Sequence, residues 1–112
     1  MQGLNKVYLI GHIGRDPDEQ TSVLDTRRVK LSIATPHLRE VDGDLVDIPD
    51  WHTLTFKGRD ADYIQTHARK GGTLAVECAI RPNKWTDQNG HTHHGMTLEV
   101  EKILSLSSRE SA

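Results

Sequence analysis

The sequence predicts an all-β domain, a small five-stranded Greek-key barrel with one short helix between its third and fourth strands. Two kinds of observation support this prediction. Several segments alternate apolar and polar residues with a period of two, and a helical pattern is confined to one short stretch. With 112 residues and a well-mixed interior, the chain has room for one compact domain with a modest core.

The first strand is predicted in LNKVYLIGHIG, where residues 7–10 are apolar on both faces. Gly11 and Gly14 interrupt it, which favours a bend or bulge where one strand serves two sheets. A proline-aspartate turn in RDPDEQ follows. A second strand is predicted from Arg27 to Ala34, because apolar residues alternate there with more polar neighbours: Val29, Leu31 and Ile33.

The third strand is predicted from Trp51 to Lys57. Alternation places Leu54 and Phe56, with His52, on the inward face. The other face carries the polar side of the strand: Trp51, Thr53, Thr55 and Lys57. The preceding segment, REVDGDLVDIPD, is interpreted as a solvated acidic loop.

A short helix of about three turns at most is predicted in RDADYIQTHARKGG. Asp60 is the expected N-cap, and Ala61, Ile64 and Ala68 form an apolar stripe at helical spacing. The glycines that follow Arg69 and Lys70 end the helix.

The fourth strand is predicted from Thr73 to Arg81, with these residues inward: Leu74, Val76, Cys78 and Ile80. A hairpin with an Asn89-Gly90 turn leads to the fifth strand, in which Met96, Leu98 and Val100 are expected inward. Residues 1–106 would form the domain, and 107–112 a frayed polar end. This order of elements is typical of the OB-fold, whose exposed strand face and loops bind oligonucleotides or oligosaccharides.

Composition restricts the classes of function. Fourteen basic and sixteen acidic residues give a net charge of −2, so the overall charge does not favour a nucleic-acid partner. Much of the negative charge lies in the acidic segment, however, and the basic residues could gather in a local groove. No secretion signal or membrane span is found, and we expect a soluble cytoplasmic protein. The single cysteine, Cys78, is expected to be a buried strand residue.

The two tryptophans stand among polar residues, in PDWHTLTFKG and RPNKWTDQNGH. Each could cap one end of the core, but exposed indoles also stack on bases, at about 1–3 kcal/mol per base. Their neighbours are cationic, whereas carbohydrate sites recruit amides and carboxylates. Such cations favour a phosphodiester chain, although many of them could simply be solvated edge residues. Lys84, beside Trp85, is the strongest individual candidate.

Catalytic signals are weak, and we expect a protein that is not an enzyme and has no cofactor. His91 and His93 in HTHH share a face, but no cysteine or carboxylate accompanies them at a zinc-site spacing, so no metal is expected. A metal-dependent nuclease built on the acidic segment is a weaker alternative, since nothing there fixes the carboxylates.

Three segments carry a resemblance to the bacterial single-stranded DNA-binding protein (SSB) family, over about the first 105 positions: NKVYLIGHIGRDP, DWHTLTFKGRDADYIQTHARKGG and IRPNKWTDQNGH. The resemblance implies an OB-fold, a homotetramer in preference to a dimer, and binding of single-stranded DNA in replication, recombination and repair at the bacterial nucleoid. It also implies the site residues. Trp51 and Trp85 would stack on bases, and cations would contact the DNA backbone: Arg59, Lys70, Arg81 and Lys84. Lys57, which stands in the same strand as Trp51, is expected to add a further phosphate contact. Oligomer contacts would come from the first strand and the third: Lys6, Tyr8, Ile10 and His52.

The chain also departs from the family pattern. Leu38 and Lys57 stand where stacking aromatics are usual, which would weaken binding. The sequence stops at SSRESA without the family's linker and acidic tip, which suggests either a shortened chain or a divergent member from a phage, plasmid or integrative element. These departures keep an alternative open: an OB-fold adaptor that contacts a replication or recombination protein and retains weak DNA binding.

Overall fold

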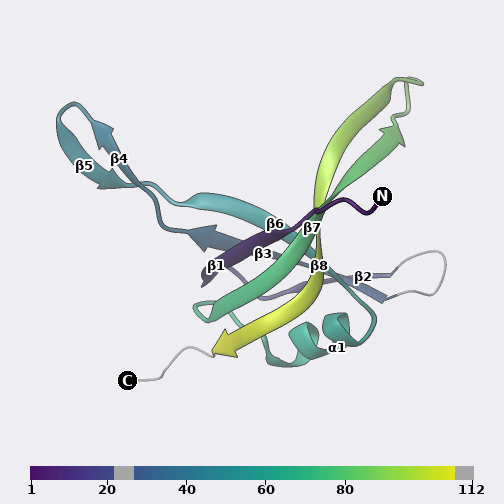
Figure 1. Cartoon of the computed structure of the whole chain (residues 1–112), viewed down its shortest axis with the longest axis horizontal. Coiled ribbons are helices and arrows are strands. Elements are labelled where there is room, and N and C mark those ends of the chain that lie inside the picture. Colours follow the sequence, from purple (N-terminus) through teal and green to yellow (C-terminus); the bar gives the residue numbers. More distant parts are fainter. Residues whose placement is uncertain (22–26, 108–112) are drawn as a thin grey trace.

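The computed structural model describes residues 1–21 and 27–107. Figure 1 shows a barrel of curved strands with one helix at its lower end. In chain order the elements are β1 (Val7–Ile13), β2 (Asp18–Thr21), β3 (Arg27–Thr35), β4 (Leu38–Val41), β5 (Asp44–Asp47), β6 (Asp50–Lys57), α1 (Gly58–His67), β7 (Thr73–Thr86) and β8 (Thr92–Ser107). The polar residues 108–112, part of the predicted frayed end, lie outside the described residues.

The main sheet has the strand order β1-β7-β8-β6-β3-β2, and a further pairing of β1 with β3 closes it into a barrel. β1 pairs with β7 through residues 7–12 and with β3 at His12 and Ile13. The interrupted first strand therefore serves two neighbours of one closed sheet, rather than two sheets. Helix α1 lies between the third and fourth barrel strands, so the predicted all-β Greek-key barrel is confirmed.

The core follows the predicted alternation in the middle of the barrel. Residues from β3 and β6 are buried as expected: Val29, Leu31, Ile33, Leu54 and Phe56. From α1 and the residue after it, Ala61, Ile64 and Ala68 are fully buried against them. Cys78 is also buried as predicted, and burial raises the pKa of its thiol to about 11.

The predicted N-cap of the helix was wrong. Gly58, with φ of +60°, turns the chain directly from β6 into α1, so the helix begins two residues earlier than Asp60. Lys57 occupies the N-cap position without a side-chain capping bond. Asp60 lies in the first turn, where its charge still favours the helix dipole.

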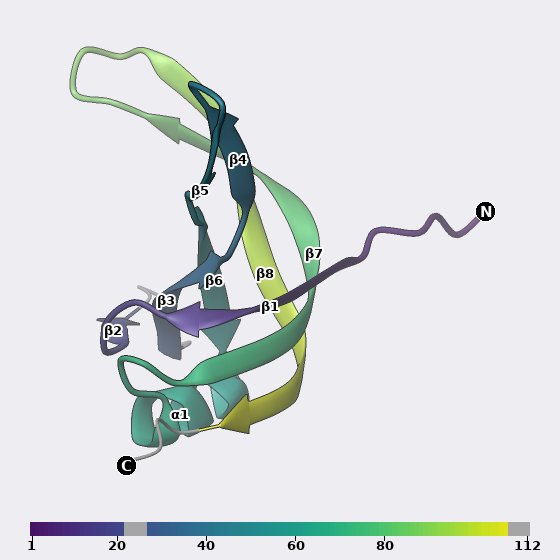
Figure 2. The ribbon, with the colours of Figure 1, turned by 90° about the vertical axis from the view of Figure 1, so that its left-hand side faces the viewer.

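Two hairpin arms project from the end of the barrel opposite α1, as both ribbon views show (Figures 1 and 2). One is β4–β5, in the segment predicted to be a loop; this prediction was wrong. Asp42 and Gly43 both have positive φ, of 53° and 85°, which suits a tight hairpin turn. Every residue of β4 and β5 is exposed. These strands therefore have no buried face that a pattern in the sequence could have indicated.

The other arm continues β7 and β8 beyond the barrel, with paired residues as far as Thr86 and Thr92. The predicted turn at Asn89-Gly90 is confirmed, with Gly90 at φ of +81°. The expected burial of Ile80 and Met96 was wrong, since both side chains are exposed. Ile80 pairs with Leu98 and Met96 with Pro82, beyond the part of β7 that pairs with β1, so β1 does not cover them.

Candidate nucleic-acid interface

Strand register decides which polar side chains share the outer face of the barrel. Directly opposed residues of antiparallel strands lie on the same face. On β3 and β6 the outward pairs are Arg28 with Lys57, Lys30 with Thr55, Ser32 with Thr53, and Ala34 with Trp51. One stripe of this face therefore leads from a tryptophan at one end to cations at the other.

Trp51 lies on the surface and does not cap the core, since 60% of it is exposed. Its ring lies against Gly14, the residue after β1: a Cβ at Gly14 would lie 2.6 Å from Cη2 of Trp51. Gly14, Arg15, Ser32 and Trp51 line a shallow cavity of about 250 Å³ beside the ring. The glycine thus allows the indole to lie flat with one side open.

Trp85 lies on the β7–β8 arm, opposite His93, and is 49% exposed. The two rings stack with centroids 5.3 Å apart and an interplanar angle of 19°. The Trp85 ring also passes over Gly95, where a Cβ would lie 3.2 Å from Cζ3. One side of this indole is therefore held by its own strand pair.

Asp87 fixes the stacking histidine. His93 Nε2 lies 2.7 Å from Asp87 Oδ2, and the backbone N–H groups of Asn89 and His91 donate to Oδ1 at 2.9 Å each. The hydrogen bond from His93, then those from the backbone of His91 and Asn89, hold the pKa of Asp87 below its usual value. The turn and the ring stack are thus one hydrogen-bonded unit.

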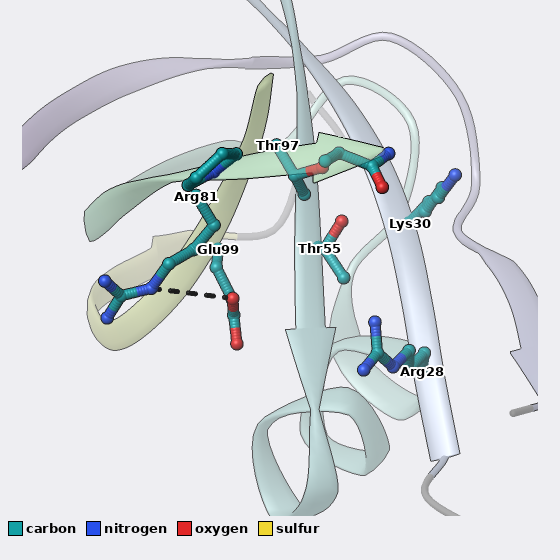
Figure 3. A pocket seen from close by; sticks show the side chains of 8 residues that line it. Arg28, Lys30, Thr55, Arg81, Thr97 and Glu99 are labelled. Carbon is teal, nitrogen blue, oxygen red and sulfur yellow. Dashed lines mark ion pairs between the residues drawn. The ribbon is translucent and has the colours of Figure 1, made fainter. Parts of the chain in front are cut away.

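A groove of about 280 Å³ crosses the outer face between β3, β6, β7 and β8. Its lining residues are Arg28, Lys30, Thr55, Arg81, Pro82, Asn83, Thr97 and Glu99. Figure 3 shows Arg81 and Glu99 on one side of Thr55, with Arg28 and Lys30 on the other. Alternation along β7 puts Arg81, Asn83 and Trp85 on one face, so the groove continues onto the arm that carries the second indole.

The groove contains one carboxylate among its cations. Glu99 forms ion pairs with Lys57 and, at 3.9 Å, with Arg81 Nε. Arg81 Nη2 also lies 3.6 Å from Glu101. The predicted DNA-binding residues Lys57 and Arg81 therefore lie together on this face, but both are paired with acids.

The other predicted cations lie elsewhere. Arg59 is an exposed residue of the first turn of α1, and Lys70 is exposed just after the helix, with its backbone N–H donating to Asp16 at 2.9 Å. Helix α1 itself lies at the opposite end of the barrel from the arm formed by β7 and β8 (Figure 1). Lys84 lies opposite His94 and, by alternation, on the other face of the arm from Trp85.

Sequence reasoning did not assign Arg28, Lys30, Thr55 and Thr97 to the site. The first two were noticeable as a basic cluster, and their alternation with the buried Val29 and Leu31 was a signal that they face outward. The sequence alone does not show how β3 pairs with β6 or how β6 pairs with β8. These pairings bring the four side chains to one groove.

The predicted oligomer residues of β1 form an exposed face. Tyr8 and Ile10 are 63% and 68% exposed. The Tyr8 hydroxyl donates to Glu77 at 2.9 Å, and this bond raises the pKa of the tyrosine. Lys6 donates to Glu101 at 2.7 Å and pairs with Glu77 at 3.4 Å.

His52 lies on the inward side of β6, half-buried, with Nε2 3.0 Å from the Thr35 hydroxyl. It is thus already partly covered within one chain.

Within residues 1–21 and 27–107, no cluster of three histidine, cysteine or acidic side chains is arranged to hold a metal ion. The same part of the chain contains no helix that is long and apolar enough to cross a membrane.

Comparison with known proteins gives consistent matches. The model of the single-strand binding protein family matches residues 4–106. The single-stranded DNA-binding protein of Xanthomonas axonopodis pv. citri is 29% identical over 109 residues, covering 96% of this chain and 61% of the relative. Single-stranded DNA-binding protein 1 of Xylella fastidiosa is 30% identical over 112 residues, covering 98% of this chain and 82% of the relative. The chain thus spans about three fifths of the first of these relatives.

A solved structure is also similar. The Plasmodium falciparum SSB in complex with single-stranded DNA superposes with a TM-score of 0.76 at 25% identity, over 96% of each chain. The predicted OB-fold is therefore confirmed by a structural match as well as by the strand order.

Proposed function

Because this chain belongs to the single-strand binding protein family, we propose that it binds single-stranded DNA without strong sequence preference. The observation that carries this proposal is the outer face of the barrel, where a cationic groove shares its strands with two exposed indoles, Trp51 on β6 and Trp85 on β7. The similar structure with bound single-stranded DNA supports the same ligand.

Each part of the face has a physical role in this proposal. Trp51 and Trp85 offer flat surfaces on which bases can stack. Stacking tolerates any DNA sequence because every base has a π-face. Along the same face, basic side chains neutralise phosphates: Arg28, Lys30, Lys57 and Arg81. Arg59, Lys70 and Lys84 would meet the backbone only where a longer strand wraps beyond this face.

The biological setting is also a proposal. A protein of this kind protects single-stranded DNA during replication, recombination or repair, in the cytoplasm at the nucleoid, and is not an enzyme. We propose that it works as a homotetramer that associates through the β1 face of Lys6, Tyr8 and Ile10, with a contribution from His52. A replication or recombination protein would be a further partner.

Titration with oligo-dT tests the proposal. Both tryptophans are exposed, so stacking on bases should quench the intrinsic fluorescence, and affinity should fall steeply with salt as phosphates exchange protein contacts for counterions. A fluorescence signal that does not respond to oligo-dT at low salt would contradict the proposal.

A second candidate function is an OB-fold adaptor with residual DNA binding. Two observations favour it: Glu99 neutralises part of the groove, and the β4–β5 arm exposes Leu38 and Leu45. An adaptor would bind oligo-dT weakly and show little dependence on salt. The same titration series therefore separates the two functions.

A further inference from the structure

We propose that Glu99 is an affinity-determining residue that competes with DNA phosphates for the cations of the groove. This inference rests on the proposed binding of single-stranded DNA. It concerns how tightly the face binds and how strongly salt affects it.

The position of Glu99 follows from strand register. On β8 it pairs with Ala79 of β7 on one side and with Thr55 of β6 on the other. Both neighbours are short, so the carboxylate reaches the groove that it lines. Its side chain is 23% exposed, which places the charge at the wall of the groove and not out in solvent.

The partners of Glu99 are two of the cations that would meet phosphates. Lys57 forms an ion pair with Oε1, and Arg81 Nε lies 3.9 Å from Oε2. Figure 3 shows the second of these contacts at the edge of the groove. Carboxylate and phosphate oxygens accept charge-assisted hydrogen bonds from the same donors, so a phosphate entering here must take the place of Glu99.

The far side of the groove is different. Arg28 and Lys30 line it from β3, and Glu99, the one carboxylate among the described residues that line the groove, pairs with Lys57 and Arg81 and not with them. On the β3 side a phosphate would thus meet cations that Glu99 does not hold, and on the β8 side a cation–carboxylate pair. Glu99 pairs with two of the cations and repels the incoming phosphate, and both effects lower the affinity for DNA.

The experiment compares Glu99→Gln with wild type in oligo-dT titrations over a series of salt concentrations. Glutamine keeps the shape of the side chain and removes its charge. We expect affinity at low salt to rise roughly 3- to 10-fold. The plot of log K against log salt should steepen by about 0.7, because one more phosphate is neutralised per binding event.

Glu40→Gln is the matched control. Glu40 is an exposed residue of β4 on the other arm and does not line the groove. The two variants change the net charge equally. We expect Glu40→Gln to change affinity by less than about 2-fold.

A second variant tests the same idea in the opposite direction and guards against a folding defect in Glu99→Gln. Thr97→Glu adds a carboxylate to the groove lining and should weaken binding and flatten the salt dependence. Equal effects of Glu99→Gln and Glu40→Gln, or a loss of affinity in folded Glu99→Gln, would overturn the inference while wild type still binds. If wild type does not bind oligo-dT, the proposed function itself fails, and the inference with it.

Discussion

Trp85 illustrates how single residues shape the proposed interface. Its ring is stacked on His93 and passes over Gly95, so the side away from the strand pair is the one open to a base. The exposed position of both tryptophans could be predicted from their polar neighbours. The identity of the supporting ring could not, because His93 meets Trp85 only through the pairing of β7 with β8.

We predict that Trp85→Ala weakens oligo-dT binding by about 1–3 kcal/mol, through the loss of one base stack. Fluorescence anisotropy of labelled oligo-dT measures this change. His94→Ala is the matched control, since His94 lies on the same arm but, by alternation, on the opposite face. Equal affinities of folded Trp85→Ala and wild type would rule out a stacking role for this ring.

Asp87 gives the arm a dependence on pH. The pKa of its carboxyl group is lowered, chiefly by the hydrogen bond from His93 and then by the backbone N–H of His91. A lowered folded-state pKa means that the carboxylate stabilises the turn above the unfolded-state value, about 3.9. This stabilisation is lost as pH falls through the folded-state pKa.

We therefore predict that the amide NMR signals of Asn89 and His91 titrate with an apparent pKa below 3.9, at which the turn loosens. In Asp87→Asn the same transition should be absent. A wild-type titration at the ordinary value for aspartate would show that the hydrogen bonds to Asp87 are not maintained in solution.

At the level of elements, β1 and the residue that follows it require glycine for different reasons, at Gly11 and at Gly14. A Cβ at Gly11 would lie 2.7 Å from the carbonyl oxygen of Ala34, whereas a Cβ at Gly14 would meet the ring of Trp51. The first neighbour is backbone of the closing strand pair and cannot move freely. The second is the end of an exposed side chain, which can turn away.

We predict that Gly11→Ala lowers the free energy of unfolding by roughly 1–3 kcal/mol, whereas Gly14→Ala leaves stability nearly unchanged and weakens oligo-dT binding. Thermal melts and oligo-dT titrations of both variants measure the two effects. A large loss of stability in Gly14→Ala would show that the Trp51 ring is held more firmly than its exposure suggests.

The strands that could be predicted are those with one buried face. In β3 and β6, alternation of buried and outward residues identified both the strand and its orientation. The β4–β5 arm has no buried face, so its only signal was the Asp42-Gly43 dipeptide, which suits a hairpin turn. The predicted fourth strand ended at Arg81 and not at Thr86 because the last residues of β7 are exposed and also have no buried face.

The net charge of the whole molecule is −2. The function proposed for the outer face depends instead on which charged side chains lie close to one another in the fold. Closure of the barrel aligns ion pairs across β6, β8, β7 and β1: Lys57 with Glu99, Arg81 with Glu99 and Glu101, and Lys6 with Glu101 and Glu77. These contacts join residues far apart in the chain, so no spacing in the sequence could predict them. They also connect the proposed DNA groove to the face proposed for self-association.

The exposed face of β1 is the surface through which we propose that the chains associate. Tyr8 and Ile10 expose most of their apolar surface on β1, next to the charged end of the ion-pair row. Apolar side chains at this level of exposure on a paired strand favour coverage by another subunit. A charge placed among them would have to be buried on association, which is costly.

We predict that Ile10→Glu converts the proposed homotetramer to a smaller species, seen by light scattering as a fall from about four chain masses towards one. Leu45→Glu is the matched control, because Leu45 is 73% exposed on the β4–β5 arm, away from β1. That variant should keep the wild-type mass. An unchanged mass for folded Ile10→Glu would remove β1 from the subunit contact, and the exposed apolar surface there would then need another partner.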